Sequence, residues 1–279
     1  MSWFEALIAG IIQGLTEFLP VSSSGHLVIY GTLTSETGSG DLAFTVFLHI
    51  ATLLAVIIVF RKDVWMLICE FFMALADIFR GRPDFISPRR RFLLMVVIGT
   101  IPAVIIGGAI KVLDLDAMLE NIFVVAVMLI VTAVFMFLVD RQKDGNLTAR
   151  DAPMKTAWLV GILQGIAILP GLSRSGSTIF GGVVSGLKKE FAVRYAFILS
   201  IPVILGSAII EFRGVIKEGD VSVEPLAWAL GFIAAFFCGL LAIKLIRVLI
   251  KSNKFYIFGV YCLCASAFAF LVGAGVIHG

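Results

Sequence analysis

In this 279-residue chain, the polar and charged residues best suited to catalysis are concentrated in two short segments. Residues 10–27 read GIIQGLTEFLPVSSSGHL and residues 161–178 read GILQGIAILPGLSRSGST, so the second segment repeats the first at a constant offset of 151. The two copies differ in their reactive groups. The first carries an acid and an imidazole, Glu17 and His26, and the second carries a guanidinium, Arg174.

Each segment places a proline and a group of hydroxyls before what should be a helix N-terminus. Unpaired N–H groups and the helix dipole favour an anion there. Arg174 adds a two-pronged donor suited to phosphate oxygens. The segments therefore predict a phosphate site with the short donors Ser22, Ser24, Ser173, Ser175 and Thr178. The alternative is that these small residues only allow close helix packing, which leaves the costly charge of Arg174 unexplained.

Glu17 supports two kinds of chemistry. Gln13 lies one helical turn before it, so the two side chains can share a face and hold a divalent cation, Mg²⁺ or Ca²⁺, that bridges phosphate oxygens. Ser23 could attack phosphorus with His26 or Glu17 as its base. Direct attack by water, with either residue as base, is equally compatible with the sequence.

The composition defines the surroundings of these segments. With 60% hydrophobic and 15% charged residues and a mean hydropathy of +1.06, the chain is an integral membrane protein. A net charge of +3 gives no case for nucleic acid, so membrane lipids are the expected surroundings. Six stretches have close to the roughly 20 residues that cross a bilayer as a helix: residues 43–60, 92–110, 121–139, 191–211, 226–246 and 255–277.

The two motif segments interrupt the remaining apolar stretches, residues 3–33 and 157–186. Their flanking pieces are too short to span a bilayer separately. Irregular backbone at membrane depth survives only where protein or a wet cavity satisfies its polar groups. Both stretches are therefore predicted to be re-entrant helical hairpins with buried turns.

The repeat extends beyond the hairpins. Gly99 and Gly107 match Gly231 and Gly239, and FMFLV at 135–139 resembles FAFLV at 268–272. Each half then has one hairpin and three crossings, an odd number that turns the second half upside down. The predicted fold is an all-α integral membrane protein with six transmembrane helices plus two re-entrant hairpins in an inverted-topology repeat. It forms a single membrane domain, 1–279, with halves 1–140 and 157–279 joined by the connector 140–156.

Charge placement predicts the orientation. Of the 22 Lys and Arg, 17 lie in segments 61–91, 140–155, 187–194 and 247–254, which the six spans place on one side. Such a bias marks the cytoplasmic side, so both termini are expected outside. Residues 64–79 are apolar but flanked by basic residues, and are expected to lie at the inner surface or to form an incomplete span.

The motifs QGLTEFLPVSSSGH and PGLSRSGST, at this separation in a helical chain of this size, closely resemble those of the bacterial undecaprenyl-pyrophosphate phosphatases, also known as bacitracin-resistance proteins. The resemblance covers essentially the whole chain. It implies hydrolysis of undecaprenyl pyrophosphate to undecaprenyl phosphate and inorganic phosphate in the bacterial cytoplasmic (inner) membrane. That reaction recycles the lipid carrier of peptidoglycan and other wall polymers.

By this resemblance, Glu17, Ser23, His26 and Arg174 fall on the family's essential positions. Arg194 matches another basic position and would help bind phosphate, although anchoring at the inner surface explains it equally well. The family's acidic motif admits Glu or Gln at its first position, and this chain has Gln13, which leaves one carboxylate there. A homodimer is a further expectation.

A transporter or lipid flippase is the alternative from another class. Broken helices that meet at the midplane of an inverted repeat are typical of secondary transporters, and an Arg at helix N-termini would bind an anionic lipid or a small anion. Release of phosphate from a C55 pyrophosphate separates the two functions, because a pure carrier releases none.

The orientation predicts which loops meet an impermeant reagent. After the four native cysteines are replaced, single cysteines at Gly38 and Gly219 should react with a membrane-impermeant thiol reagent applied to intact cells. Cysteines at Ser87 and Gly145 should react only after the cells are opened, because their loops carry the basic residues. Labelling of the connector from outside would contradict the opposed orientation of the halves.

Overall fold

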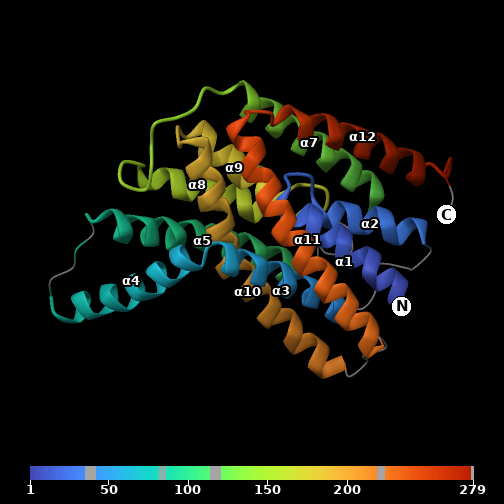
Figure 1. The fold of residues 1–279 in the computed structure, drawn as a ribbon, viewed down its shortest axis with the longest axis horizontal. Helices are drawn as coiled ribbons and strands as arrows, with labels where there is room; N and C mark the ends of the chain where they lie inside the picture. Colours follow the sequence, from blue (N-terminus) through green and yellow to red (C-terminus); the bar gives the residue numbers. More distant parts are fainter. Residues whose placement is uncertain (35–41, 82–83, 85, 114–120, 219–223, 278–279) are drawn as a thin grey trace.

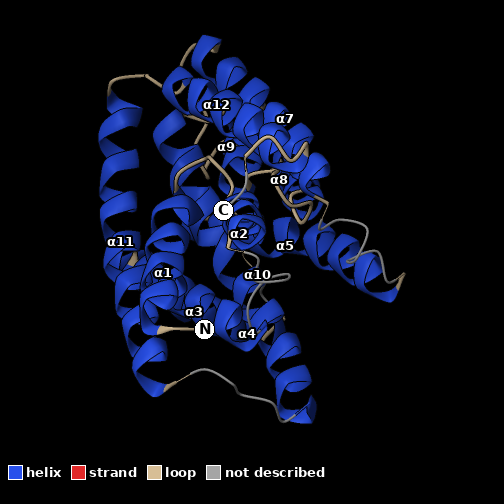
Figure 2. Cartoon of the chain, turned by 90° about the vertical axis from the view of Figure 1, so that its right-hand side faces the viewer, coloured by secondary structure: helices blue, strands red, loops and turns tan. Residues whose placement is uncertain are grey.

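The computed structural model describes residues 1–34, 42–81, 84, 86–113, 121–218 and 224–277. Every regular segment in this part of the chain is a helix (Figure 2). The helices are α1 (Trp3–Phe18), α2 (Ser23–Leu33), α3 (Leu42–Val59), α4 (Arg61–Phe79), α5 (Pro88–Val112), α7 (Ile122–Arg141), α8 (Met154–Ile166), α9 (Arg174–Val184), α10 (Lys189–Glu218), α11 (Pro225–Lys251) and α12 (Tyr256–Gly273). The all-α prediction is confirmed.

Five helices are long and apolar enough to cross a membrane: α5, α7, α10, α11 and α12. They coincide with five of the six predicted spans. The sixth, α3, meets the same criteria only together with α4, and the pair is bent by 87°. The described chain therefore has five candidate spans, or six if the bent pair counts as one.

The outer surface of these helices is apolar. Only 33% of the most apolar window of α11 is buried, and the side chains of Phe237 and Leu241 are 62% and 57% exposed. Val104 and Ile105 on α5 are exposed to a similar extent. A helix that is apolar on its exposed face needs lipid around it, so the chain is a multi-pass membrane protein.

Four shorter helices form the predicted hairpin segments. α1 and α2 have 16 and 11 residues, and α8 and α9 have 13 and 11. Each is shorter than the roughly 20 residues that a crossing needs. The breaks lie at residues 19–22 and 167–173, within the two motif segments.

α4 begins at Arg61, three residues before the predicted segment, and leaves α3 almost at a right angle. It is fixed to α5 by Arg90, which is buried and donates to Glu70 Oε1 at 2.7 Å and to Asp77 Oδ2 at 2.9 Å. The large apolar side chains of α4, among them Trp65 and Phe72, are exposed. This combination is typical of a helix that lies at a membrane surface.

Helix pairs pack through glycine. In Figures 1 and 2, α1 lies along α11 and α7 lies along α12, while α8 packs on α5. A Cβ on Gly10 would lie 2.3 Å from the carbonyl oxygen of Gly231, and one on Gly161 would lie 2.3 Å from that of Gly99. Gly10 matches Gly161 in the repeated motif, and Gly99 matches Gly231. Each close contact thus joins a glycine of a motif segment to a glycine of a long helix.

The N-terminus and the C-terminal end of α12 lie on the same side of the molecule. Figure 1 draws both on the right, whereas the described parts of the α4–α5 loop and the connector between α7 and α8 lie on the left. Of the labelling positions named above, Gly38 and Gly219 are outside the described residues. A cysteine at Gly145 is unsuitable because its Cβ would lie 2.1 Å from the carbonyl oxygen of Gly186. The exposed Lys143 is the better connector position.

The glycine contacts predict a difference between two alanine variants. Gly161→Ala should lower the free energy of unfolding by about 1–3 kcal/mol, because the new methyl group must push α8 away from the backbone of α5. Gly108→Ala is the matched control, since among the described residues no atom beyond its chain neighbours and the adjacent backbone of its own helix lies within 4 Å of its Cβ position, and alanine favours a helix. Thermal unfolding in detergent measures both. Equal stability of the two variants would contradict the close packing.

Candidate active site

The turns of the two short-helix pairs touch each other. Ser175, at the start of α9, donates its hydroxyl to the carbonyl of Leu19 at 3.2 Å. A Cβ on Gly25 would lie 3.0 Å from Cα of Gly171, whose φ of +90° favours glycine. The two motif segments, which are far apart in sequence, therefore form one site.

Serine caps start the second helix of each pair. Ser22 accepts from the N–H of Gly25 at 3.3 Å, and Ser173 accepts from the N–H of Gly176 at 3.1 Å. The remaining first N–H groups of a helix have no acceptor within it, and the dipole there favours negative charge. Ser22 has φ of +70°, a strained value for a residue with a side chain. Such strain is common at functional sites.

The carboxylate of Glu17 is the centre of the site. It is 7% exposed, at the end of α1. Its Oε2 accepts from Gln13 Nε2 at 2.9 Å and from the Ser23 hydroxyl at 2.7 Å. Its Oε1 forms an ion pair with a guanidinium nitrogen of Arg174. One buried carboxylate thus joins both predicted hairpins.

Each of these contacts has chemical consequences. A carboxylate that accepts the Ser23 hydroxyl can take its proton, which is how a base activates a hydroxyl nucleophile. Arg174 is partly exposed and uses one nitrogen on Glu17. A guanidinium has five N–H donors, so the others can bind oxygens of a ligand.

His49 on α3 is a member of the site that the sequence analysis missed. Its Nδ1 donates to the Thr45 carbonyl at 2.8 Å, and its Nε2 lies 3.9 Å from Glu17 Oε2. The available signal was a lone histidine inside the predicted span 43–60. The motif comparison could not find it, because it lies outside both copies.

His26 is directed away from Ser23. Its Nδ1 contacts the carbonyl of Ser22 at 2.7 Å, and its Nε2 contacts the hydroxyl of Tyr261 at 2.8 Å. Since a carbonyl only accepts, Nδ1 carries the proton and a neutral ring accepts from Tyr261 at Nε2. Tyr261 on α12 also stacks on the ring and was not among the predicted site residues.

The other hydroxyl groups predicted to bind phosphate differ in whether they already have a hydrogen-bond partner in the protein. Thr178 bonds to the carbonyl of Arg174 at 2.8 Å, within its own helix. Ser24 is exposed, with its hydroxyl 3.4 Å from that of Ser22. Thr132 on α7, which the sequence analysis did not select, accepts from the Ser173 N–H at 3.0 Å and holds the second turn in place.

Arg194 lies in a different environment from the Glu17 centre. Its guanidinium donates to both carboxylate oxygens of Asp63 at the start of α4, and it lies 5.6 Å from the ring centroid of Phe92. The structure therefore gives Arg194 a partner of its own at the α4–α10 contact. It is not brought together with Arg174.

The second copy of the motif contains two buried polar side chains that have no hydrogen-bond partner within the described structure. Gln164 and Ser177 match Gln13 and His26 in the first copy. Gln164 is 1% exposed and Ser177 is fully buried, and among the described residues their side-chain polar atoms have no hydrogen-bond partner. Gln13 Oε1 is likewise buried and has no hydrogen-bond partner among the described residues.

Metal ligation was expected at Glu17 and Gln13. In the part of the chain that the structure describes, no group of three or more His, Cys, Asp or Glu could hold a metal ion. Gln13 Oε1 is an oxygen without a partner among these residues. Both carboxylate oxygens of Glu17 already accept hydrogen bonds.

Fold and site together define a multi-pass membrane protein with a buried carboxylate, guanidinium and hydroxyl centre between two pairs of short helices. The sequence matches the family described as Bacitracin resistance protein BacA over residues 6–268. The chain belongs to this family.

Curated relatives cover nearly the whole chain. An undecaprenyl-diphosphatase of Methanosphaera stadtmanae is 41% identical over 268 residues, covering 92% of this chain and 93% of its own. One of Methanobrevibacter smithii is 39% identical, covering 97% and 98%, and one of Parabacteroides distasonis is 37% identical, covering 95% and 96%. Because these relatives come from archaea as well as bacteria, the family does not fix a bacterial source.

Substitutions of Arg174 and Arg194 are expected to differ in their effect on turnover. Arg174→Ala should lower turnover by roughly a hundredfold to a thousandfold, the usual cost of losing a charge-stabilising donor, and Arg174→Lys should remain severely impaired because it loses the forked geometry. Arg194→Ala should retain most of the activity, since its partner is Asp63. Phosphate release by folded, purified variants is the measurement. Near wild-type turnover of Arg174→Ala would contradict the site.

Proposed function

We propose that this chain hydrolyses undecaprenyl pyrophosphate to undecaprenyl phosphate and inorganic phosphate, and so recycles the lipid carrier of cell-wall polymers and supports bacitracin resistance. The names of its full-length relatives support the reaction. The observation that carries the proposal is the shared Glu17 carboxylate, which accepts the Ser23 hydroxyl on one oxygen and pairs with Arg174 on the other. A nucleophile, a base and a phosphate cation then meet at one point.

In the proposed first step, Ser23 Oγ forms a bond to the terminal phosphorus while its proton moves to Glu17 Oε2. The bond from phosphorus to the bridging oxygen breaks, and undecaprenyl phosphate leaves with that electron pair. Arg174 and the helix N-termini at Ser22 and Ser173 stabilise the charge on the phosphoryl oxygens. Ser22, Ser24, Ser173 and Ser175 line the phosphate.

In the second step, water attacks the phosphoserine. The bond between Oγ and phosphorus breaks, Glu17 returns its proton to Ser23, and the released phosphate keeps the protons of the water. His26 supports the turn through the Ser22 carbonyl and Tyr261. Glu17 is preferred over His26 as the base because only Glu17 contacts the Ser23 hydroxyl.

We infer that the fold is an inverted repeat of residues 1–140 and 157–279, with α1–α2 and α8–α9 as re-entrant hairpins whose turns meet at membrane depth. The exchanged glycine contacts support this arrangement, because Gly10 meets Gly231 as Gly161 meets Gly99. In this proposal α3 completes the six crossings and α4 lies at the surface. The charge bias puts both termini outside the cytoplasmic membrane.

A divalent cation is proposed only as an auxiliary to this chemistry. Gln13 Oε1 and the Glu17 carboxylate would hold it, and when bound it would neutralise charge on the pyrophosphate. The unpartnered Gln13 oxygen supports this role.

The reaction is tested with purified protein in detergent and undecaprenyl pyrophosphate. Stoichiometric release of inorganic phosphate and formation of the monophosphate are expected, with Glu17→Gln reducing both by a hundredfold or more. A chelator arm measures the cation requirement. A carrier without hydrolase activity would release no phosphate, and that outcome would overturn the proposal.

Ser23 and Ser24 offer a matched test of the nucleophile. Ser23→Ala should lose essentially all turnover, whereas Ser24→Ala, a neighbouring exposed hydroxyl, should stay within about tenfold of the wild type. Rapid acid quenching with substrate labelled at the terminal phosphate should show label on Ser23. If water attacks directly, Ser23→Ala loses only a hydrogen bond, or roughly 10- to 100-fold in rate, and no label is found.

A further inference from the structure

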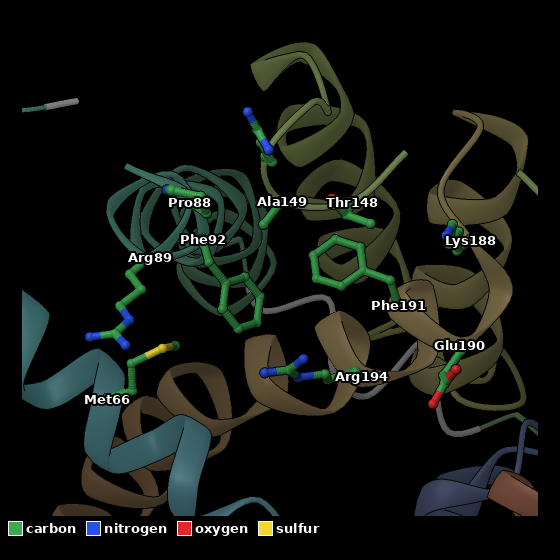
Figure 3. A pocket seen from close by; sticks show the side chains of 11 residues that line it. Met66, Pro88, Arg89, Phe92, Thr148, Ala149, Lys188, Glu190, Phe191 and Arg194 are labelled. Atoms are coloured by element: carbon green, nitrogen blue, oxygen red, sulfur yellow. The ribbon is translucent and has the colours of Figure 1, made fainter. Parts of the chain in front are cut away.

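A cavity of about 490 Å³ lies apart from the Glu17 centre, between α4, α5, α10 and the connector that joins α7 to α8. Figure 3 shows its walls, with Met66 from α4, Arg89 and Phe92 from α5, and Phe191 and Arg194 from α10. The remaining lining residues are Pro88, Thr148, Ala149, Arg150, Lys188 and Glu190. The walls combine aromatic rings with basic side chains.

The cavity carries an excess of positive charge. Arg194 is neutralised by Asp63. Arg89, Arg150 and Lys188 have no hydrogen-bond or ion-pair partner for their side chains within the described ranges, and the single acid on the wall is Glu190. In Figure 3, Glu190 lies at the far end of the cavity from Arg89. Three cations therefore face one carboxylate.

The connector is held in place by the protein and does not depend on a ligand. Arg91 donates to the carbonyl of Ala149 at 3.2 Å and to that of Ala152 at 2.7 Å. These two bonds flank Arg150 and fix its backbone beside α5. The basic wall is thus part of the fold.

The position of the cavity along the helices corresponds to the edge of the apolar layer. Arg89 is the second residue of α5 and Phe191 the third of α10, so two candidate spans begin here. Next to Met66, Trp65 on α4 is 68% exposed, and tryptophan favours the depth of the lipid headgroups. Phe92 and Phe191 in the wall and the exposed apolar side chains of α4 offer apolar surface that acyl chains can contact.

We propose that this cavity binds the phosphate of an anionic phospholipid, with Arg89, Arg150 and Lys188 around the headgroup and the acyl chains along α4. Basic pockets between membrane helices bind such headgroups because the phosphate meets several cations at the surface. The site is separate from the catalytic centre and does not depend on the proposed hydrolysis.

Native mass spectrometry in detergent tests the proposal, with phosphatidylglycerol as the probe and phosphatidylcholine and inorganic phosphate as comparison arms. The wild type should retain phosphatidylglycerol at concentrations at least tenfold lower than the triple variant Arg89→Gln, Arg150→Gln and Lys188→Gln, because each cation near a surface contributes about fivefold. Arg80→Gln, Arg141→Gln and Lys155→Gln form the matched control, since all three are exposed basic residues outside the cavity.

Each outcome decides the question. A specific headgroup site would be overturned if the control variant lost as much phosphatidylglycerol as the triple variant. It would also be overturned if the wild type retained phosphatidylcholine as well as it retains phosphatidylglycerol. Binding of inorganic phosphate without phosphatidylglycerol would assign the cavity to free phosphate and overturn the lipid assignment. Unfolding temperatures establish that the variants fold, and Arg150→Gln alone, an exposed change in the connector, should still lower retention if the triple variant is unstable.

Discussion

The ion pair between Glu17 and Arg174 is the interaction on which the site depends. Each charge would be expensive to bury alone in an apolar surrounding, and each is supplied by a different pair of short helices. Their contact makes the two turns a single unit, which the Ser175 bond to Leu19 reinforces. The same carboxylate orients the Ser23 hydroxyl. The contacts that join the two turns are therefore the same ones that the proposed chemistry uses, and a bound phosphate would share Arg174 with Glu17.

Much of the fold could be predicted from the sequence because lipid imposes simple rules on length and composition. Five spans and the two breaks at the serine-rich turns follow from apolar length and from Gly and Pro. The angle of α4 could not be derived, since it depends on Arg90 reaching Glu70 and Asp77. In the sequence, Glu70 and Asp77 are isolated acids within the apolar stretch 64–79, and Arg90 counts merely as one of the basic residues that set the orientation.

The sequence indicated which motif residues lie close together, but it did not indicate which residues distant helices bring to them. Glu17, Ser23, Gln13 and Arg174 meet as their positions in the two turns suggested. His49 comes from another helix, and a single histidine in an apolar span has no pattern that reveals its neighbour. Tyr261 and Thr132 could not be predicted from the sequence for the same reason. Arg194 stays a prediction as a phosphate ligand, and the structure adds that its guanidinium contacts Asp63.

Gln164 and Ser177 lower the stability of the α8–α9 pair. They occupy the positions of Gln13 and His26, yet within the described structure their buried polar atoms have no partner. An unsatisfied buried polar group costs about 1–3 kcal/mol, so a sequence shaped for stability alone would replace both with apolar residues. The α8–α9 pair therefore relies on its contacts with the α1–α2 pair to offset this cost. Those contacts are the ion pair of Arg174 with Glu17 and the hydrogen bond from Ser175 to the carbonyl of Leu19.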